Sequence, residues 1–329
     1  MTTAEEVDPS QNHAIVVKDL VKRFGDFAAV GGVNFTVQRG TIFGFLGPNG
    51  AGKTTTIRML LGLLKPTDGT VLILGYDVVR ELHTMRRNIG YMSQKFSLYG
   101  DLTVEENLEF YGRVYGLRRE RLTTRKAYAL EMAGLKDRRR TLTRELAGGW
   151  KQRLALGCAI LHEPKVLFLD EPTAGVDPIS RRAFWDLLYE LANKGATIFV
   201  TTHYMDEAER CQDLAFILDG KLIAQGSPQE IKRTKMCGQV LELSCDDARL
   251  ALPILREMQL FDEVALYGAR IHLVAENAAV HIPLLHQHFS DAGIALHAVD
   301  EVLPSLEDVF ISQVRARIDA GGDLVKTAG

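Results

Sequence analysis

The octapeptide GPNGAGKT at positions 47–54 constrains this chain more than any other feature. It fits the phosphate-binding pattern G-x-x-x-x-G-K-[ST] at every fixed position, with an apolar stretch, TIFGFL, before it and a helical pattern, TTIRMLLGLL, after it. This strand–loop–helix context is the one that the pattern requires. Its glycines let consecutive backbone N–H groups converge at the positive end of a helix, which binds anions. The sequence therefore predicts a nucleoside-triphosphate site.

Two side chains of this loop have a predicted chemical role. We expect the ammonium of Lys53 to reach the β- and γ-phosphates, and the hydroxyl of Thr54 to ligate Mg²⁺. The residues expected to contact the nucleotide are Gly47, Pro48, Asn49, Gly50, Ala51, Gly52, Lys53, Thr54 and Thr55. The alternative is an accidental glycine turn; on average residue usage, a full match by chance in a chain this long is on the order of one in a hundred.

The composition narrows the class of protein. The 329 residues are enough for two domains. With 46% apolar residues, 25% charged residues and a formal net charge of −3, nothing global favours nucleic acid as a partner. The apolar stretches fall far short of the roughly 18 residues of a membrane span, and the N-terminus has no secretory signal. The four cysteines show no C-x-x-C pairing, so we expect a soluble protein of a reducing cytosol without structural zinc.

The order of the apolar stretches predicts an α/β fold. Strands around the phosphate loop are followed by later strands at VLFLD, ATIFVTT and LAFILDG, and strands that alternate with helices form a mostly parallel sheet covered on both faces. A helical insert at about 96–163 interrupts this core. We expect a flexible tail over 1–13, the core over 14–230, a small α+β domain of βαββαβ order over 237–316, and a tail over 317–329.

Polar side chains at the ends of predicted strands form the candidate catalytic group. Asp170 and Glu171 end VLFLDE, and this edge of an open α/β sheet is where ligands bind. We expect Asp170 to hold Mg²⁺ through water and Glu171 to polarise the attacking water. His203 closes ATIFVTTH and should meet the same edge, although a lone histidine there is more often structural. Gln94, at the end of IGYMSQ, can reach the metal and the water with its amide.

A second glycine turn directly precedes the acidic strand. In LAGGWKQRLALGCAILHEP (146–164), two glycines at a helix start form another anion site from backbone N–H groups and the helix dipole. Taken in order, GPNGAGKTT, Gln94, LAGGW, VLFLDEP, AGVDP (174–178) and His203 resemble the nucleotide-binding subunit of ABC transporters. The resemblance covers about 14–228, and this order of motifs is very specific.

The resemblance implies a fold, ligands and a partner. The fold is that of P-loop (RecA-like) NTPases with a helical insert subdomain, and the ligands are ATP and Mg²⁺. In this family two copies dimerise head to tail, with ATP between the phosphate loop of one and the glycine signature of the other, here Ala147, Gly148 and Gly149. By position, Phe24 would stack on adenine; its alternative is a core phenylalanine. Asp177 matches the aspartate that couples the two sites across the dimer.

The signature departs from the family pattern at two positions. The family commonly has serine and glutamine where this chain has Ala147 and Trp150. A serine would donate a hydrogen bond to the γ-phosphate, and losing a bond to a charged group costs roughly 1.5–3 kcal/mol if nothing replaces it. We therefore expect a weaker or slower ATP sandwich. The sequence does not explain Trp150; one interpretation is that it packs at the dimer seam.

The subfamily resembles drug-resistance ATPases that serve ABC-2-type exporters. The signs are a single cassette without fused spans, the AGVDP turn and a C-terminal extension containing PSLEDVFI (304–311). The resemblance implies a homodimer, bound peripherally at the cytoplasmic side of the cell membrane to a separate permease. Two alternatives stay open: a soluble ABC ATPase acting on ribosomes or nucleic acid, and a regulatory module that does not turn over. The transported substrate cannot be deduced.

Two segments of the helical insert allow more than one interpretation. The basic segment 118–144 is either a solvated helical face or a surface facing anionic lipid. In segment 97–117, exposed aromatics such as Tyr99 would receive a coupling helix of the permease, whereas Tyr111 and Tyr115, at i, i+4 spacing, are equally consistent with a core.

Overall fold

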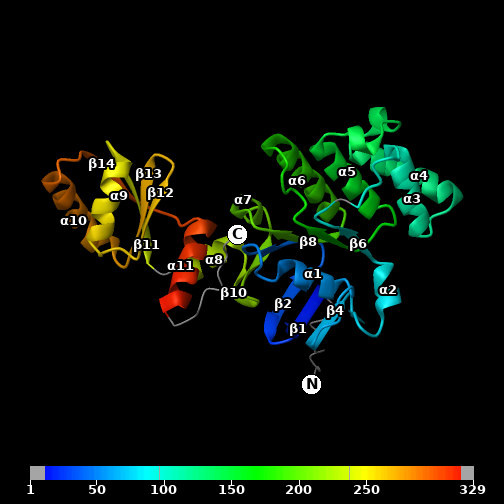
Figure 1. Ribbon diagram of the computed structural model, residues 1–329, viewed down its shortest axis with the longest axis horizontal. Coiled ribbons are helices and arrows are strands. Elements are labelled where there is room, and N and C mark those ends of the chain that lie inside the picture. The colour runs from blue at the N-terminus through cyan, green and yellow to red at the C-terminus, as the bar shows by residue number, and fades with distance from the viewer. Residues whose placement is uncertain (1–11, 96, 237, 320–329) are drawn as a thin grey trace, which may run out of the picture. The chain divides into compact units, whose positions relative to one another are not determined.

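The computed structural model describes residues 12–95, 97–236 and 238–319 (Figure 1). The contacts divide the chain into two compact units, with the boundary between Gln225 and Gly226. Helix α8 (Pro228–Lys235) falls in the second unit, whereas the core was expected over 14–230 and the small domain over 237–316. The expected flexible tail over 1–13 and the tail over 317–329 lie largely outside the described residues; the first strand begins at His13 and the last helix ends at Asp319.

A six-stranded sheet is the centre of the first unit, in the order β10-β9-β3-β8-β7-β6. The five strands from β9 to β6 pair in parallel, as the alternation of strands and helices predicted. Three of them (β3, β7 and β8) are buried along their whole length, which explains their continuous apolar runs. The bounds are β3 Ile42–Leu46, β6 Ile89–Met92, β7 Val166–Asp170, β8 Thr197–Thr202, β9 Asp213–Leu218 and β10 Lys221–Gly226.

A separate four-stranded sheet, in the order β2-β1-β4-β5, was not predicted. Its described pairs are antiparallel, and its first hairpin turns at Gly25, with Phe24 paired to Phe27. We had assigned these strands to one mostly parallel sheet, because local patterns do not show which strands pair. The bounds are β1 His13–Phe24, β2 Phe27–Gln38, β4 Asp68–Ile73 and β5 Tyr76–Asp77.

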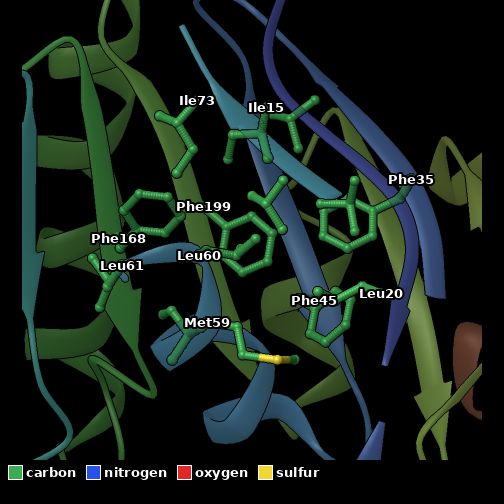
Figure 2. Close-up of a cluster of buried hydrophobic side chains, with 14 of the residues drawn as sticks. Ile15, Leu20, Phe35, Phe45, Met59, Leu60, Leu61, Ile73, Phe168 and Phe199 are labelled. Atoms are coloured by element: carbon green, nitrogen blue, oxygen red, sulfur yellow. The ribbon is translucent and has the colours of Figure 1, made fainter. Parts of the chain in front are cut away.

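Helix α1 (Lys53–Leu60) packs between these two sheets. Figure 2 shows Met59, Leu60 and Leu61 beside side chains from both sheets, among them Ile15 and Phe45. The four rings of Phe35, Phe43, Phe45 and Phe199 pack with centroids 5.5–6.0 Å apart. The phosphate loop, which joins β3 to α1, is therefore fixed at both ends by the core.

The opposite face of the six-stranded sheet is covered by α5 (Gly148–Ala159) and α6 (Pro178–Asn193). Trp185 and Phe184 of α6 are fully buried there. The short helices α2 (Leu82–Arg86) and α7 (Met205–Ala208) belong to the connections.

The helical insert has a core of its own. Helices α3 (Val104–Val114), α4 (Arg119–Met132) and α5 pack together around buried leucines and alanines, and Figure 1 shows them grouped beside the sheet. Tyr111 and Tyr115 are partly buried against this core, whereas Tyr99 is 48% exposed. The insert also contains the 3-10 turns Lys136–Arg138 and Thr143–Glu145.

The second unit has the predicted order of strands and helices. Its antiparallel sheet has the order β12-β13-β11-β14, and α9 and α10 pack on it around Leu255, Leu285 and Phe289. In α11, Gln313 donates a hydrogen bond to the Lys235 carbonyl of α8 at 2.6 Å. The bounds are β11 Gln239–Cys245, α9 Ala248–Glu257, β12 Glu263–Tyr267, β13 Arg270–Ala275, α10 Ala278–Asp291, β14 Leu296–Val302 and α11 Leu306–Asp319.

Among the residues that the structure describes, no helix combines the length and the apolar character needed to cross a bilayer.

Candidate active site

The phosphate loop needs its glycines for two different reasons. A Cβ at Gly47 would lie 2.3 Å from the carbonyl oxygen of Ile217 in the neighbouring strand β9, so no side chain fits. Gly52, at the N-cap of α1, has φ +107°, and a Cβ there would also lie 2.6 Å from the Ala29 carbonyl. Gly50 has φ +81°, with open space around it. The loop is therefore shaped by close packing on one side and by left-handed backbone on the other.

Lys53 is almost completely buried, with 4% of its surface exposed. Its Nζ donates hydrogen bonds to the carbonyls of Gly47, at 2.8 Å, and Pro48, at 3.1 Å. The same Nζ lies 3.2 Å from Oε1 of Glu171. The charge of Lys53 is thus held at the mouth of the loop by one carboxylate and two carbonyl dipoles.

Glu171 is held in an unusual backbone conformation directly after β7. Its φ is +46°, in the left-handed region, and such residues persist where the surroundings hold them. Its backbone N–H donates to the Thr201 carbonyl, at 3.1 Å, and to the Thr201 hydroxyl, at 3.0 Å. Thr201 in turn donates to Oδ1 of Asp170 at 2.7 Å. Strand β8 therefore fixes both acidic residues through one threonine that the sequence analysis missed.

The two carboxylates differ in their surroundings. Burial raises the pKa of Asp170 above its usual value, and the nearby charge of Glu171 adds to that shift, against the hydrogen bond from Thr201 and the charge of Lys53. Burial, with the charge of Asp170 second, raises the pKa of Tyr91 to about 12. Burial thus makes the charged form of Asp170 costly, and a cation bound beside it would offset that cost.

Gln94 and His203 meet at Glu171. The Gln94 amide donates to Oε2 of Glu171 at 3.0 Å, and Nδ1 of His203 lies 3.3 Å from the same oxygen, outside hydrogen-bond alignment. These residues come from three strand ends, β6, β7 and β8, which are neighbours in the sheet. Because parallel strands bring their carboxyl ends to one edge, the side chains converge as the sequence predicted.

Half of the residues predicted to bind the nucleotide line an open cavity of about 560 Å³, as do Glu171 and His203. The other eight do not line it: Gly47, Pro48, Ala51, Ala147, Gly148, Gly149, Asp170 and Asp177. The lining residues are Phe24, Phe27, Ala29, Asn49, Gly50, Gly52, Lys53, Thr54, Thr55, Gln94, Glu171, Ala174 and His203.

Two phenylalanines stand at the rim of this cavity. Phe24 is 52% exposed, which excludes the alternative that it is a core residue, and the Nζ of Lys22 lies 5.2 Å from its ring centroid. Phe27, its partner across the hairpin, is 57% exposed. The sequence analysis missed Phe27, although its place three residues after Phe24 across a glycine turn was a usable signal.

The signature turn is the start of α5. Ala147 is the N-cap and provides no side-chain hydrogen bond. A Cβ at Gly148 would meet nothing within 4 Å, whereas one at Gly149 would lie 2.6 Å from the Ser180 hydroxyl of α6. Trp150 does not project freely: it packs against the insert core, with the guanidinium groups of Arg138 and Arg153 at 4.9 and 5.1 Å from its ring.

Asp177 is the N-cap of α6, and its carboxylate accepts a hydrogen bond from the Ser180 N–H at 2.9 Å. This bond lowers the pKa of Asp177 below its usual value. Ser180 thus connects the two motifs, because it bonds to Asp177 and limits the side chain that position 149 can carry.

The donor set fits a magnesium ion. Mg²⁺ prefers oxygen ligands and keeps several waters. Thr54 and Asp170 are close enough for a side-chain hydrogen bond, which is among the smaller influences on the Asp170 pKa. Gln94 adds an amide oxygen at the same edge, while its amide nitrogen points to Glu171.

Comparisons with known proteins agree with this geometry. A family model described as "ABC transporter" matches residues 30–174, and a model for an AAA domain matches residues 150–205. The chain is 42% identical over 243 residues to the "Nod factor export ATP-binding protein I" of Ralstonia nicotianae. The matched residues make up 74% of this chain and 74% of that protein. The chain belongs to the ABC transporter ATP-binding proteins.

Further relatives extend the match. The "Daunorubicin resistance ATP-binding protein DrrA3" of Streptomyces coeruleorubidus is 42% identical over 67% of this chain and 70% of its own length. Escherichia coli "Probable multidrug ABC transporter ATP-binding protein YbhF" is 54% identical over 66% of this chain, but this match covers only 38% of YbhF. The chain therefore spans well under half the length of that relative.

Solved structures show the same fold. A cbiO1 structure from Clostridium perfringens, described as part of the ABC transporter complex cbiONQ, has a TM-score of 0.63 and 29% identity and covers 75% of this chain and 98% of its own. A dimeric structure of the ATP-binding cassette MJ0796, bound to ADP and Pi, has a TM-score of 0.59 and 28% identity, over 65% and 98%.

Proposed function

We propose that this chain binds and hydrolyses ATP and thereby drives an ABC-2-type exporter whose permease is a separate protein. The convergence of Lys53, Gln94 and His203 on the carboxylate of Glu171 carries this proposal. Lys53, Thr54, Gln94, Glu171 and His203 line one cavity, and Asp170 directly precedes Glu171 at the end of β7. The matches to ATP-binding proteins named for multidrug, daunorubicin and Nod factor export favour export over action on ribosomes or nucleic acid.

Each residue has a defined task in this chemistry. Lys53 and the N–H groups of the phosphate loop hold the β- and γ-phosphates. Thr54, Asp170 and Gln94 would hold Mg²⁺, Asp170 through water; the ion neutralises charge on the phosphates. Glu171 orients the water that attacks the γ-phosphate. Phe24 stacks on the adenine ring.

His203 lies beside Glu171 Oε2 and contacts the γ-phosphate. Its position at the end of β8, next to the strand that ends in the two acids, supports this role.

A second copy of the chain completes the site. In this arrangement the N-terminus of α5, with Ala147, Gly148 and Gly149, faces the γ-phosphate bound to the partner, and Asp177 couples the two sites. The dimeric structure of the cassette MJ0796 supports the part of this proposal that concerns dimerisation. We place the dimer at the cytoplasmic side of the cell membrane, bound peripherally to its permease, with the second unit as an accessory domain.

The test is ATP hydrolysis by the purified chain and by Glu171→Gln. The variant keeps the shape of the side chain and removes the carboxylate, so we expect turnover to fall at least about 100-fold while ATP still binds. Equal rates for the two proteins would overturn the catalytic assignment, and no turnover by the natural chain would favour the regulatory alternative. Purification from native membranes with a multi-span permease in stoichiometric amount would support export; ribosomes or nucleic acid in its place would contradict it.

A further inference from the structure

Glu207 is a carboxylate with no exposed surface, four residues after His203 on α7. A buried carboxylate is costly unless hydrogen bonds and an opposite charge compensate it. The sequence analysis gave it no role, and it does not line the nucleotide cavity. The side chains that contact its carboxylate indicate a role.

Three side chains meet at the Glu207 carboxylate. Oε2 accepts a hydrogen bond from the hydroxyl of Thr202 at 2.7 Å, and Oε1 accepts one from the hydroxyl of Thr173. The Nε of Arg181 lies 3.5 Å from Oε1 and supplies the opposite charge. Two hydroxyl donors and a guanidinium suit a carboxylate, because both of its oxygens accept, better than an amide, whose nitrogen can only donate.

Each partner belongs to a different segment of the candidate active site. Thr202 directly precedes His203, and its hydroxyl also accepts the N–H of Tyr204 at 3.0 Å, which closes the turn around the histidine. Thr173 lies two residues after Glu171, in the turn that follows β7. Arg181 lies in the first turns of α6, whose N-cap is Asp177.

A second contact ties the same segments together. The guanidinium of Arg181 lies over the ring of Tyr204, 4.4 Å from its centroid, so α6 contacts the residue after His203 as well as Glu207. Arg181 also lies 3.5 Å from Asp206, but the Asp206 side chain is 62% exposed, and such an ion pair contributes little.

We propose that Glu207 is a positioning residue for ATP hydrolysis, which holds His203, the Glu171 turn and the start of α6 in one fixed arrangement. Glu207 does not line the nucleotide cavity; it acts through Thr202 on His203 and through Thr173 on Glu171. Asp177 is the N-cap of α6. A change in the orientation of α6 would therefore be transmitted to His203 through Arg181 and Glu207. This inference rests on the proposed roles of Glu171 and His203 in hydrolysis.

The test compares Glu207→Gln with Asp206→Asn in the full chain, since both replace a carboxylate on α7 and only the first is buried. Glu207→Gln should lower kcat about 10- to 100-fold, the size of effect that a small misplacement of catalytic groups produces. The KM for ATP should stay within about twofold, because the phosphate loop keeps its contacts. Asp206→Asn should leave both constants within about twofold.

A double-mutant cycle separates positioning from general support of the fold. If Glu207 acts through His203, then Glu207→Gln should have less than about a third of its effect on kcat in a His203→Ala background. Additive effects on kcat would overturn the coupling to His203. Should Glu207→Gln not fold, the isosteric Thr202→Val removes one of the hydroxyl partners and should lower kcat in the same way; an unchanged kcat in Thr202→Val would overturn the proposal.

The same assays distinguish this inference from the function on which it depends. A fall in kcat for Glu171→Gln but not for Glu207→Gln rejects the positioning role and leaves the proposed hydrolysis intact. Equal rates for the natural chain and Glu171→Gln reject the assignment of Glu171, and with it the inference.

Discussion

The starts of α1 and α5 are both glycine-rich, yet they differ in how much of a phosphate site the chain supplies at each. At α1, the lysine is buried, its charge is paired with Glu171, and Gly52 fits closely against the Ala29 carbonyl. At α5, Gly148 borders open space and Ala147 offers no side-chain cap. The start of α1 is therefore closely packed around a paired cation, whereas the start of α5 is open, which suits the proposed role of a second copy in completing it.

The largest effect is expected from removal of the charge at α1. Lys53→Ala should weaken ATP binding at least about 100-fold, because it removes a cation from two phosphates and leaves Glu171 buried without its ion pair. Titration with a fluorescent ATP analogue measures this. The control is Lys136→Ala, which removes an exposed lysine paired with Glu131. Similar affinities for the natural chain and Lys53→Ala would contradict the claim that the start of α1 holds the phosphates through its lysine.

The two signature glycines should respond in opposite ways. Gly149→Ala forces a Cβ against the Ser180 hydroxyl, so we expect it to lower the free energy of unfolding by about 1–3 kcal/mol. Gly148→Ala meets no neighbour and should leave stability unchanged or raise it by up to about 1 kcal/mol. Thermal unfolding of both variants checks this.

A second substitution tests whether contact with Ser180 causes the loss of stability in Gly149→Ala. In a Ser180→Gly background the obstructing atoms are gone, so Gly149→Ala should cost much less. An equal cost in both backgrounds would place the constraint on position 149 elsewhere.

The rim of the phosphate site at α1 should contribute less than its lysine. Phe24→Ala should raise the KM for ATP about 2- to 10-fold, the range for the loss of one aromatic stacking contact. Inorganic tripolyphosphate carries no base, so its inhibition constant should not change. A parallel shift for ATP and tripolyphosphate would show that Phe24 shapes the loop and does not hold adenine.

The smallest effect is expected from Ala147→Ser. The backbone at this N-cap already has φ −63° and ψ 158°, so a serine hydroxyl can cap α5 and stabilise it by about 1 kcal/mol. If the hydroxyl also reaches the partner's γ-phosphate, turnover should rise. Higher thermal stability with unchanged turnover would mean that another group already makes that contact.

The parts of the site that the sequence predicted are those set by local geometry. The phosphate loop, the acidic strand end and the signature turn each need a short run of residues at fixed spacing, and the structure places each at a helix start or strand end. Thr201 and Phe27 were missed because an isolated threonine or phenylalanine has no spacing pattern of its own. The four-stranded antiparallel sheet was missed because pairing partners are not encoded locally.

The sequence by itself determined the chemistry that this chain can offer: the residue types, their order, and their places at strand ends and helix starts. Only the tertiary structure decided which of them act together. Gln94 and Glu171 are 77 positions apart and meet at 3.0 Å because β6 and β7 pair in parallel. Glu207 gains partners from three segments in the same way. Contacts at such separations depend on strand order and helix packing, which arise from burial of the whole core and not from any short stretch of residues.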